Sequence, residues 1–124
     1  MNFLLSAKGD SVYAGGLDGK AYAYPLQGGA PRELSSEGLI PGETYLSFMN
    51  DGRTVFTVQY GDRSAQLFKM DGITRRHTLL RDLVPEDKSG LLGVRNPVVS
   101  SDGRTIAFQA RRYLARLYLA EGLR

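Results

Sequence analysis

The chain has 124 residues, of which 42% are hydrophobic and 23% are charged, which excludes a disordered chain and favours one globular domain over residues 1–124. It has no cysteine, and this excludes disulfide bonds, thiolate metal sites and cysteine nucleophiles. The formal net charge of +3 is unevenly divided, since residues 1–62 carry 4 basic and 7 acidic side chains and residues 63–124 carry 12 and 6, so we expect one basic side.

A turn followed by an apolar strand recurs three times along the chain. The pattern occurs in residues 101–119 (SDGRTIAFQARRYLARLYL), in residues 50–70 (NDGRTVFTVQYGDRSAQLFKM) and, more loosely, in residues 8–26 (KGDSVYAGGLDGKAYAYPL). The repeated apolar position falls at Val12, Val55 and Ile106, with spacings of 43 and 51 residues. A period of this length is typical of β-propeller blades rather than of helical repeats.

An aromatic residue follows each of these positions at a nearly constant distance. Tyr24, Phe68 and Tyr118 come 12, 13 and 12 residues after the repeated apolar position. Two adjacent strands joined by a hairpin produce a fixed offset of this kind. We therefore expect each aromatic residue to lie in the strand next to its apolar counterpart.

Residues 1–38 form the first expected unit, a four-stranded antiparallel meander. Asp18-Gly19 supplies a hairpin turn, because glycine adopts positive φ easily, and Gly28-Gly29 supplies a second turn. Pro31 suits the edge of a sheet, because proline cannot donate a ladder hydrogen bond. The expected strands are residues 2–6, 11–15, 20–24 and 31–34.

Residues 39–84 form the second expected unit, with turns at Asp51-Gly52, Gly61-Asp62 and Asp71-Gly72. Its expected strands are residues 44–49, 54–60, 64–70 and 75–80. The run at residues 55–58 (VFTV) is largely apolar at successive rather than alternate positions. Both faces of that strand are therefore expected to contact protein.

Residues 85–124 form the third expected unit, and a connection at residues 81–93 accounts for the longer second spacing. Its expected strands are residues 95–100, 104–111 and 114–120, with Arg112 and Tyr113 in the hairpin turn between the last two. This last blade lacks its outer strand. We therefore expect an all-β fold, a β-propeller segment of three blades that makes up about half of a six-bladed ring. Such a segment is expected to be the carboxyl-terminal part of a larger ring or to self-associate.

The residues that carry chemistry elsewhere do not form a catalytic or metal-binding motif here. The Asp-Gly dipeptides lack the closely spaced oxygen ligands of a calcium site, so we interpret them as turns. His77 is the only histidine, no GxSxG turn accompanies it, and its place on an expected outer strand predicts an exposed edge position. The glycines at 15, 16 and 19 do not match a phosphate-binding GxGxxG motif. We expect neither enzyme activity nor a cofactor or metal site in this chain.

Three arginines near the end of the chain are the candidate binding residues. Arg111, Arg112 and Arg116 lie around Tyr113 in the sequence, and proteins that bind single-stranded nucleic acid place cations beside aromatic rings in this way. Solvated surface charge is the simpler explanation of such a group. Nucleic-acid binding is therefore the weaker expectation for these residues.

Part of the chain resembles a known family. The DGRT-aliphatic-x-aromatic pattern at residues 102–108, and at residues 51–57 with Thr57 in place of the aromatic residue, resembles the repeats of TolB-type β-propellers. Residues 79–124, which open with LxRDLxPEDxxGLxGV and continue through SSDGRTIAF to RRYLARLYLAEGLR, look like the carboxyl terminus of acidobacterial-type serine/threonine protein kinases. In that family a kinase domain precedes a TolB-like propeller, so the resemblance implies a sensory or interaction module. It implies no kinase activity for this chain, which has no glycine-rich loop, HRD or DFG motif.

We therefore expect a non-catalytic interaction or ligand-binding module of a bacterial, kinase-linked regulatory protein. Two alternatives stay open: the accessory propeller of a prolyl-oligopeptidase-like hydrolase, and a module that binds anionic polymers through its basic half. The expected partners are a second copy or further propeller blades, and a protein or small-molecule ligand. No stretch approaches the roughly 18 apolar residues of a membrane-spanning helix, so we expect a soluble chain whose compartment depends on the parent protein.

Overall fold

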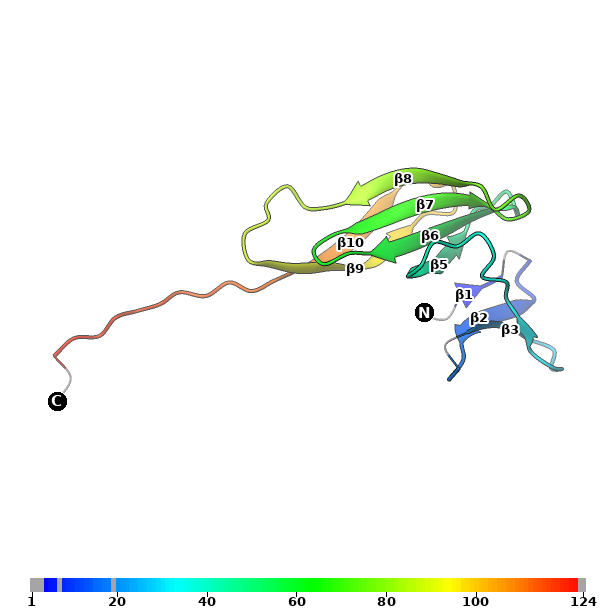
Figure 1. Cartoon of the computed structure of the whole chain (residues 1–124), viewed down its shortest axis with the longest axis horizontal. Helices are drawn as coiled ribbons and strands as arrows, with labels where there is room; N and C mark the ends of the chain where they lie inside the picture. The colour runs from blue at the N-terminus through cyan, green and yellow to red at the C-terminus, as the bar shows by residue number, and fades with distance from the viewer. Residues whose placement is uncertain (1–3, 7, 19, 123–124) are drawn as a thin grey trace.

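The computed structural model describes residues 4–6, 8–18 and 20–122. Within these ranges the chain forms ten strands, arranged in three antiparallel sheets of four, four and two strands (Figure 1). The expected all-β fold is confirmed at this level. In the same ranges, no helix is both long enough and apolar enough to cross a membrane.

The first sheet is a meander of four short strands. They are β1 (Leu4–Leu5), β2 (Ser11–Gly15), β3 (Ala21–Pro25) and β4 (Arg32–Glu33), in that order across the sheet. Val12 pairs with Leu5 on one side and with Tyr24 on the other. The meander expected for the first unit is confirmed, although Asn2, Phe3 and Gly19 of that expectation lie outside the described residues.

The second sheet is a longer meander of the same kind. Its strands are β5 (Glu43–Phe48), β6 (Thr54–Tyr60), β7 (Ala65–Asp71) and β8 (His77–Leu83), again in chain order. Val55 pairs with Phe48 and with Met70. The four-stranded prediction is confirmed, but β8 begins two residues later than expected. Arg75 belongs instead to the preceding turn, where its backbone has a φ of 63° and its N–H donates to Asp71 O.

The third sheet has two strands, β9 (Leu91–Val99) and β10 (Ile106–Arg112). β9 begins four residues earlier than expected, so part of the predicted connection is strand. The strand expected at residues 114–120 and the hairpin turn at Arg112 and Tyr113 are both wrong, because the chain continues past β10 without turning and leaves the sheet as an extended segment (Figure 1). We call residues 113–120 the arm. As described, the third unit thus has one paired strand fewer than the sequence predicts.

Val12, Val55 and Ile106 occupy equivalent places, as expected: each lies in the second strand of its sheet and pairs with the first. The expectation that each aromatic residue lies in the strand next to its apolar counterpart is confirmed for Tyr24 in β3 and Phe68 in β7, and it is wrong for Tyr118, which lies on the arm. The exact pairing partners differ between the first two sheets. Tyr24 pairs with Val12, but Phe68 pairs with Thr57 rather than with Val55. The reason is strand length, since β6 runs five residues beyond Val55 whereas β2 runs three beyond Val12.

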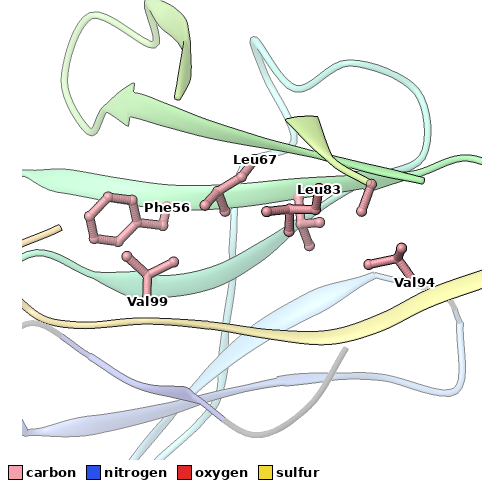
Figure 2. Packing of buried hydrophobic residues seen from close by; sticks show 7 residues of the cluster. Phe56, Leu67, Leu83, Val94 and Val99 are labelled. Carbon is pink, nitrogen blue, oxygen red and sulfur yellow. The ribbon is translucent and has the colours of Figure 1, made fainter. Parts of the chain in front are cut away.

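The hydrophobic core is centred on β6, which is packed on both faces, as the sequence predicts. On one face, a cluster joins the second sheet to β9; its buried members are Phe56, Val58, Ala65, Leu67, Leu83, Val94 and Val99 (Figure 2). On the other face, Val55 packs with Tyr45 and Met70, and Leu4 and Leu34 of the first unit lie against them. The second sheet therefore holds the other two sheets together.

Candidate functional site

The most distinctive concave feature is a groove between the second and third sheets. It lies along β5 and β9, and its lining includes Ser47, Tyr60, Arg95 and Asn96. Its volume is about 550 Å³, which falls within the roughly 300 to 1,000 Å³ of small-molecule sites. We call it the β5–β9 groove.

Two β-bulges lie in the lining of this groove. In β5, Leu46 is an extra residue, because Tyr45 and Ser47 pair with the consecutive residues Thr57 and Phe56. In β9, Asn96 and Pro97 together oppose the single residue Phe108 of β10. Bulges bend a strand and redirect its side chains, and they are over-represented next to binding and catalytic sites.

The β9 bulge holds Asn96 in the left-handed region of backbone space. Its φ is 52°, and its Nδ2 donates to Gln109 Oε1 at 3.0 Å. Such a conformation in a residue other than glycine costs about 1 to 3 kcal/mol and is found where the surrounding structure imposes it. The chain therefore keeps a locally strained bulge at the groove, while Pro97, which has no N–H to donate, fits the interruption in the ladder.

The groove also has polar groups suited to a ligand. The Arg95 guanidinium lies over the Tyr60 ring, 5.5 Å from its centroid, and its Nη1 donates to Val94 O at 2.8 Å. Burial raises the pKa of Tyr60 above its usual value, against the opposing effect of the Arg95 charge, so the phenol stays protonated at neutral pH. The Ser47 Oγ is buried and has no hydrogen-bond partner among the described residues. These side chains are potential donors to a ligand that accepts hydrogen bonds.

A second polar cluster surrounds the carboxylate of Glu43 at the start of β5. The side chain of Glu43 is fully buried, and its Oε1 accepts a hydrogen bond from the Thr57 hydroxyl. Its Oε2 accepts from the Ile40 N–H at 2.7 Å. His77 Nε2 lies 2.8 Å from Oε1, within ion-pair distance, although Nε2 has no hydrogen-bond partner among the described residues.

His77 is therefore not the exposed edge residue that the sequence predicts. Only 16% of its side chain is exposed, and its ring packs edge-on against Phe68 at 5.9 Å between centroids. The prediction was wrong because Glu43, 34 residues earlier in the chain, comes to lie beside the first residue of β8 through the pairing of β5 and β8 with the two strands between them.

The Glu43 cluster does not have the order of a charge-relay triad. In such a triad the imidazole stands between the hydroxyl nucleophile and the carboxylate. Here the carboxylate stands between the Thr57 hydroxyl and the His77 ring, so the imidazole has no hydroxyl to deprotonate. The cluster instead has a structural role: Glu43 links the connection before β5, through the Ile40 N–H, to Thr57 of β6 and His77 of β8.

The aspartates of the Asp-Gly turns bind the chain's own donors. Asp51 accepts from the backbone N–H groups of Arg53 and Thr54 and from the Thr54 hydroxyl, and the Thr54 hydroxyl is the main cause that lowers the pKa of Asp51. The N–H groups of Thr74 and Ile73 lower the pKa of Asp71 to about 2. The interpretation of these residues as turn-forming is thus confirmed for both turns. Over the described ranges, no three His, Asp or Glu side chains gather as a metal site would require.

The three candidate arginines have different surroundings. Arg111 is exposed on β10, where it pairs with Gly93, and Arg116 is exposed on the arm. Arg112 Nη1 donates to Ser89 O at 3.0 Å and lies 3.9 Å from Asp87 Oδ2. Arg112 is therefore engaged by the loop before β9, which leaves Arg111 and Arg116 as the accessible cations of the three.

The residues of the β5–β9 groove were not predicted from the sequence. One signal for them exists, namely Pro97 within β9, because proline inside a sheet marks a bulge or an edge. The second bulge, at Leu46, has no such marker.

Comparisons with protein-family models and with curated proteins give no match to this chain. The resemblance to TolB-type repeats and to kinase-linked propellers therefore stays a prediction from the sequence.

Proposed function

We propose that this chain is a non-catalytic binding module whose three sheets are consecutive blades of a TolB-type β-propeller in a bacterial, kinase-linked regulatory protein. Two observations support the blade arrangement. Val12, Val55 and Ile106 take the same place in three successive sheets, and the second sheet is packed on both faces, as an inner blade is.

The observation that carries a binding role is the presence of two bulges on one groove. Bulges redirect side chains and are over-represented next to binding sites, and the β5–β9 groove has one on each side, of which the β9 bulge holds Asn96 at a φ of 52°. β5 and β9 are the first strands of their sheets. In the proposed propeller the first strands face the central channel, so the groove would be open to a ligand that enters it.

The chemistry of the groove favours a ligand with a carboxylate or carbonyl group. Arg95 is the only cation among the described residues that line it, and a guanidinium pairs well with a carboxylate. The protonated phenol of Tyr60 and the buried hydroxyl of Ser47 add two neutral donors. The carboxyl end of a peptide, or a small organic acid, is the class of ligand that these groups suit best.

The test is an NMR titration of the ¹⁵N-labelled full chain with two pools of acetylated tripeptides, one ending in a carboxylate and the other in a carboxamide. We expect the carboxylate pool to shift the backbone amides of Ser47 and Arg95, and the carboxamide pool to shift them less. Arg95→Ala is expected to abolish the response, whereas Arg81→Ala, which removes an exposed arginine of β8, is a matched control that keeps it. Absence of any shift in the groove at millimolar peptide would contradict the proposal.

Of the two alternatives left open by the sequence, anionic-polymer binding has the weaker support, because Arg112 is held by Ser89 and Asp87. The hydrolase-linked alternative differs only in the parent protein. A kinase domain or an α/β-hydrolase domain encoded in the same reading frame would decide between them.

A further inference from the structure

The arm carries an unusual density of exposed apolar side chains. Five of its eight residues are large and apolar, and the exposed fractions reach 99% at Leu117, 85% at Leu119 and 80% at Tyr118. A soluble protein rarely leaves such a contiguous apolar segment in water, and where it does the segment usually marks an interaction site.

The arm continues the line of β10. The Tyr113 N–H donates to Gly90 O at 2.8 Å, which extends the β9–β10 pairing past the end of the strand, and the chain then runs straight on (Figure 1). Residues 104–120 contain no glycine, proline, asparagine or aspartate. Because these are the residues that form tight turns, nothing in this stretch encodes a hairpin that would fold the arm back onto β10.

Among the described residues, no strand pairs with the edge of β10 that faces away from β9, since the third sheet consists of these two strands. This edge is also regular. Both irregularities of the β9–β10 pairing place the extra residue on β9, Asn96 or Pro97 in one case and Leu92 in the other. An unpaired regular strand is a ready template for another strand.

We propose that two copies of this chain exchange their arms, each arm pairing antiparallel with the open edge of β10 in the other copy. β10 and the arm together form one continuous segment, residues 106–120. Two such segments overlap completely when the twofold axis passes through Tyr113, which gives the self-complementary interface of a symmetric dimer.

The sequence of this segment suits that register. Each residue number and that of its partner are then symmetric about 113. The resulting pairs are Ile106 with Ala120, Ala107 with Leu119, Phe108 with Tyr118, Gln109 with Leu117, Ala110 with Arg116, Arg111 with Ala115 and Arg112 with Leu114. No arginine lies directly opposite another arginine, a contact that would be destabilising. Phe108 and Tyr118 form an aromatic cross-strand pair on the face of β10 that also carries Ile106, which packs against the core.

The two arms carry enough apolar side-chain surface for the interface of a stable dimer. The four tyrosines that two arms contribute carry roughly 600 to 1,000 Å² of surface. The six leucines of the two arms add to this and bring the contact into the range of specific interfaces, about 1,200 to 2,000 Å². The inference depends neither on a propeller nor on a ligand in the β5–β9 groove, so it stands or falls separately from the proposed function.

The first test combines analytical ultracentrifugation of the full chain, from 1 to 100 μM, with hydrogen exchange of residues 106–120. We expect a concentration-dependent dimer whose arm amides are protected. The variant Arg116→Pro/Tyr118→Pro is expected to raise the dimer dissociation constant about 100-fold and to remove the protection, because proline is excluded from paired strands. Glu121→Pro, just beyond the arm, is the matched control and should leave the dimer intact.

A second test identifies the pairing itself, and the absence of cysteine from the chain makes it clean. Copies carrying Phe108→Cys are mixed with copies carrying Tyr118→Cys under mild oxidation, and we expect a mixed disulfide, because directly opposite strand residues lie about 4.5 to 5.5 Å apart. The control partner Leu114→Cys lies four residues, about 13 Å, out of register and should not cross-link to Phe108→Cys.

Three results would overturn the proposal. The first is a monomer at every concentration with unprotected arm amides. The second is a dimer that survives Arg116→Pro/Tyr118→Pro, which would indicate that whole sheet faces associate as in a closed ring. The third is an intramolecular disulfide in the Phe108→Cys/Tyr118→Cys double variant of a monomeric chain, which would show that the arm folds back onto its own β10.

Discussion

The second and third sheets start from the same repeated sequence pattern and reach different states. The same DGRT turn introduces β6 and β10. Residues 55–58 of β6 are all buried, whereas no residue of β10 is buried and only three are half-buried. The repeat therefore encodes a strand and its turn, and burial is added only where neighbouring sheets lie on both faces.

The segments that follow β6 and β10 also differ. A turn at residues 61–64, closed by the Gly61 N–H donating to Ser64 O, reverses the chain so that β7 pairs with β6. The arm has apolar residues of the kind that β7 buries, but no turn precedes it. A turn of a few residues thus decides whether an apolar segment completes its own sheet or stays available to another chain.

The second and third sheets should differ most in how much free energy of unfolding is lost when one of their apolar side chains is truncated. Phe56 is completely buried between the second sheet and β9, so Phe56→Ala should lower the free energy of unfolding by about 3 to 5 kcal/mol. Val98 of the third sheet lines the β5–β9 groove and is 63% exposed, and Val98→Ala should change the free energy of unfolding by less than about 0.5 kcal/mol. Urea denaturation followed by circular dichroism measures both. Equal losses would mean that the second sheet is not the packed centre of the protein.

A smaller effect is expected from the buried polar cluster of the second sheet. Glu43→Gln weakens the acceptor for Thr57 and Ile40 and should cost about 1 to 3 kcal/mol of unfolding free energy. The matched control is Glu33→Gln in β4, whose carboxylate forms an exposed ion pair with Lys20 at 3.2 Å and should contribute less than about 1 kcal/mol. The same denaturation experiment applies, and a loss no larger at Glu43 than at Glu33 would contradict a structural role for the cluster.

Two glycines have the same backbone angle but different surroundings, one in a packed turn and the other in an exposed part of the chain. Gly103 and Gly122 both have a φ of 74°, but a Cβ at Gly103 would lie 3.1 Å from Phe56 Cζ, whereas a Cβ at Gly122 would meet no atom within 4 Å. Gly103→Ala should therefore cost about 1 to 2 kcal/mol through backbone strain in a packed turn. Gly122→Ala should leave the unfolding free energy unchanged, because Gly122 is exposed and has open space around its Cα. A measurable loss at Gly122 would show that this end of the chain is packed.

The smallest effect is expected at acid pH, from the turn between β7 and β8. The pKa of Asp71 lies at about 2 in the folded chain, below the ordinary value of 3.8. The charged carboxylate therefore stabilises the fold above about pH 4, and this contribution is lost as the pH falls from about 4 to about 2. Asp71→Asn should reduce the loss of stability over that interval, which acid titration of the unfolding midpoint measures. An unchanged acid profile in the variant would contradict the assignment.

The sequence by itself determined the turns and the strands between them. Val12, Val55 and Ile106 were placed correctly in the second strands, and the two-sided burial of β6 was evident from four successive residues. These features are local, because the conformational preference of a glycine or aspartate and the spacing of apolar residues are properties of consecutive positions. The aromatic landmarks Tyr24 and Phe68 were placed correctly in the neighbouring strands, but Tyr118 was not, because a strand also needs a turn that brings it to a partner.

Only the tertiary structure decided how distant residues meet. Glu43 and His77 come together across 34 residues, and the bulges at Leu46 and Asn96 come to line one groove, because sheet register and sheet packing bring them there. The arm is the clearest case. Its residues have the composition of a strand, but a strand forms only where a partner edge is within reach, and no turn brings the arm to one within its own chain.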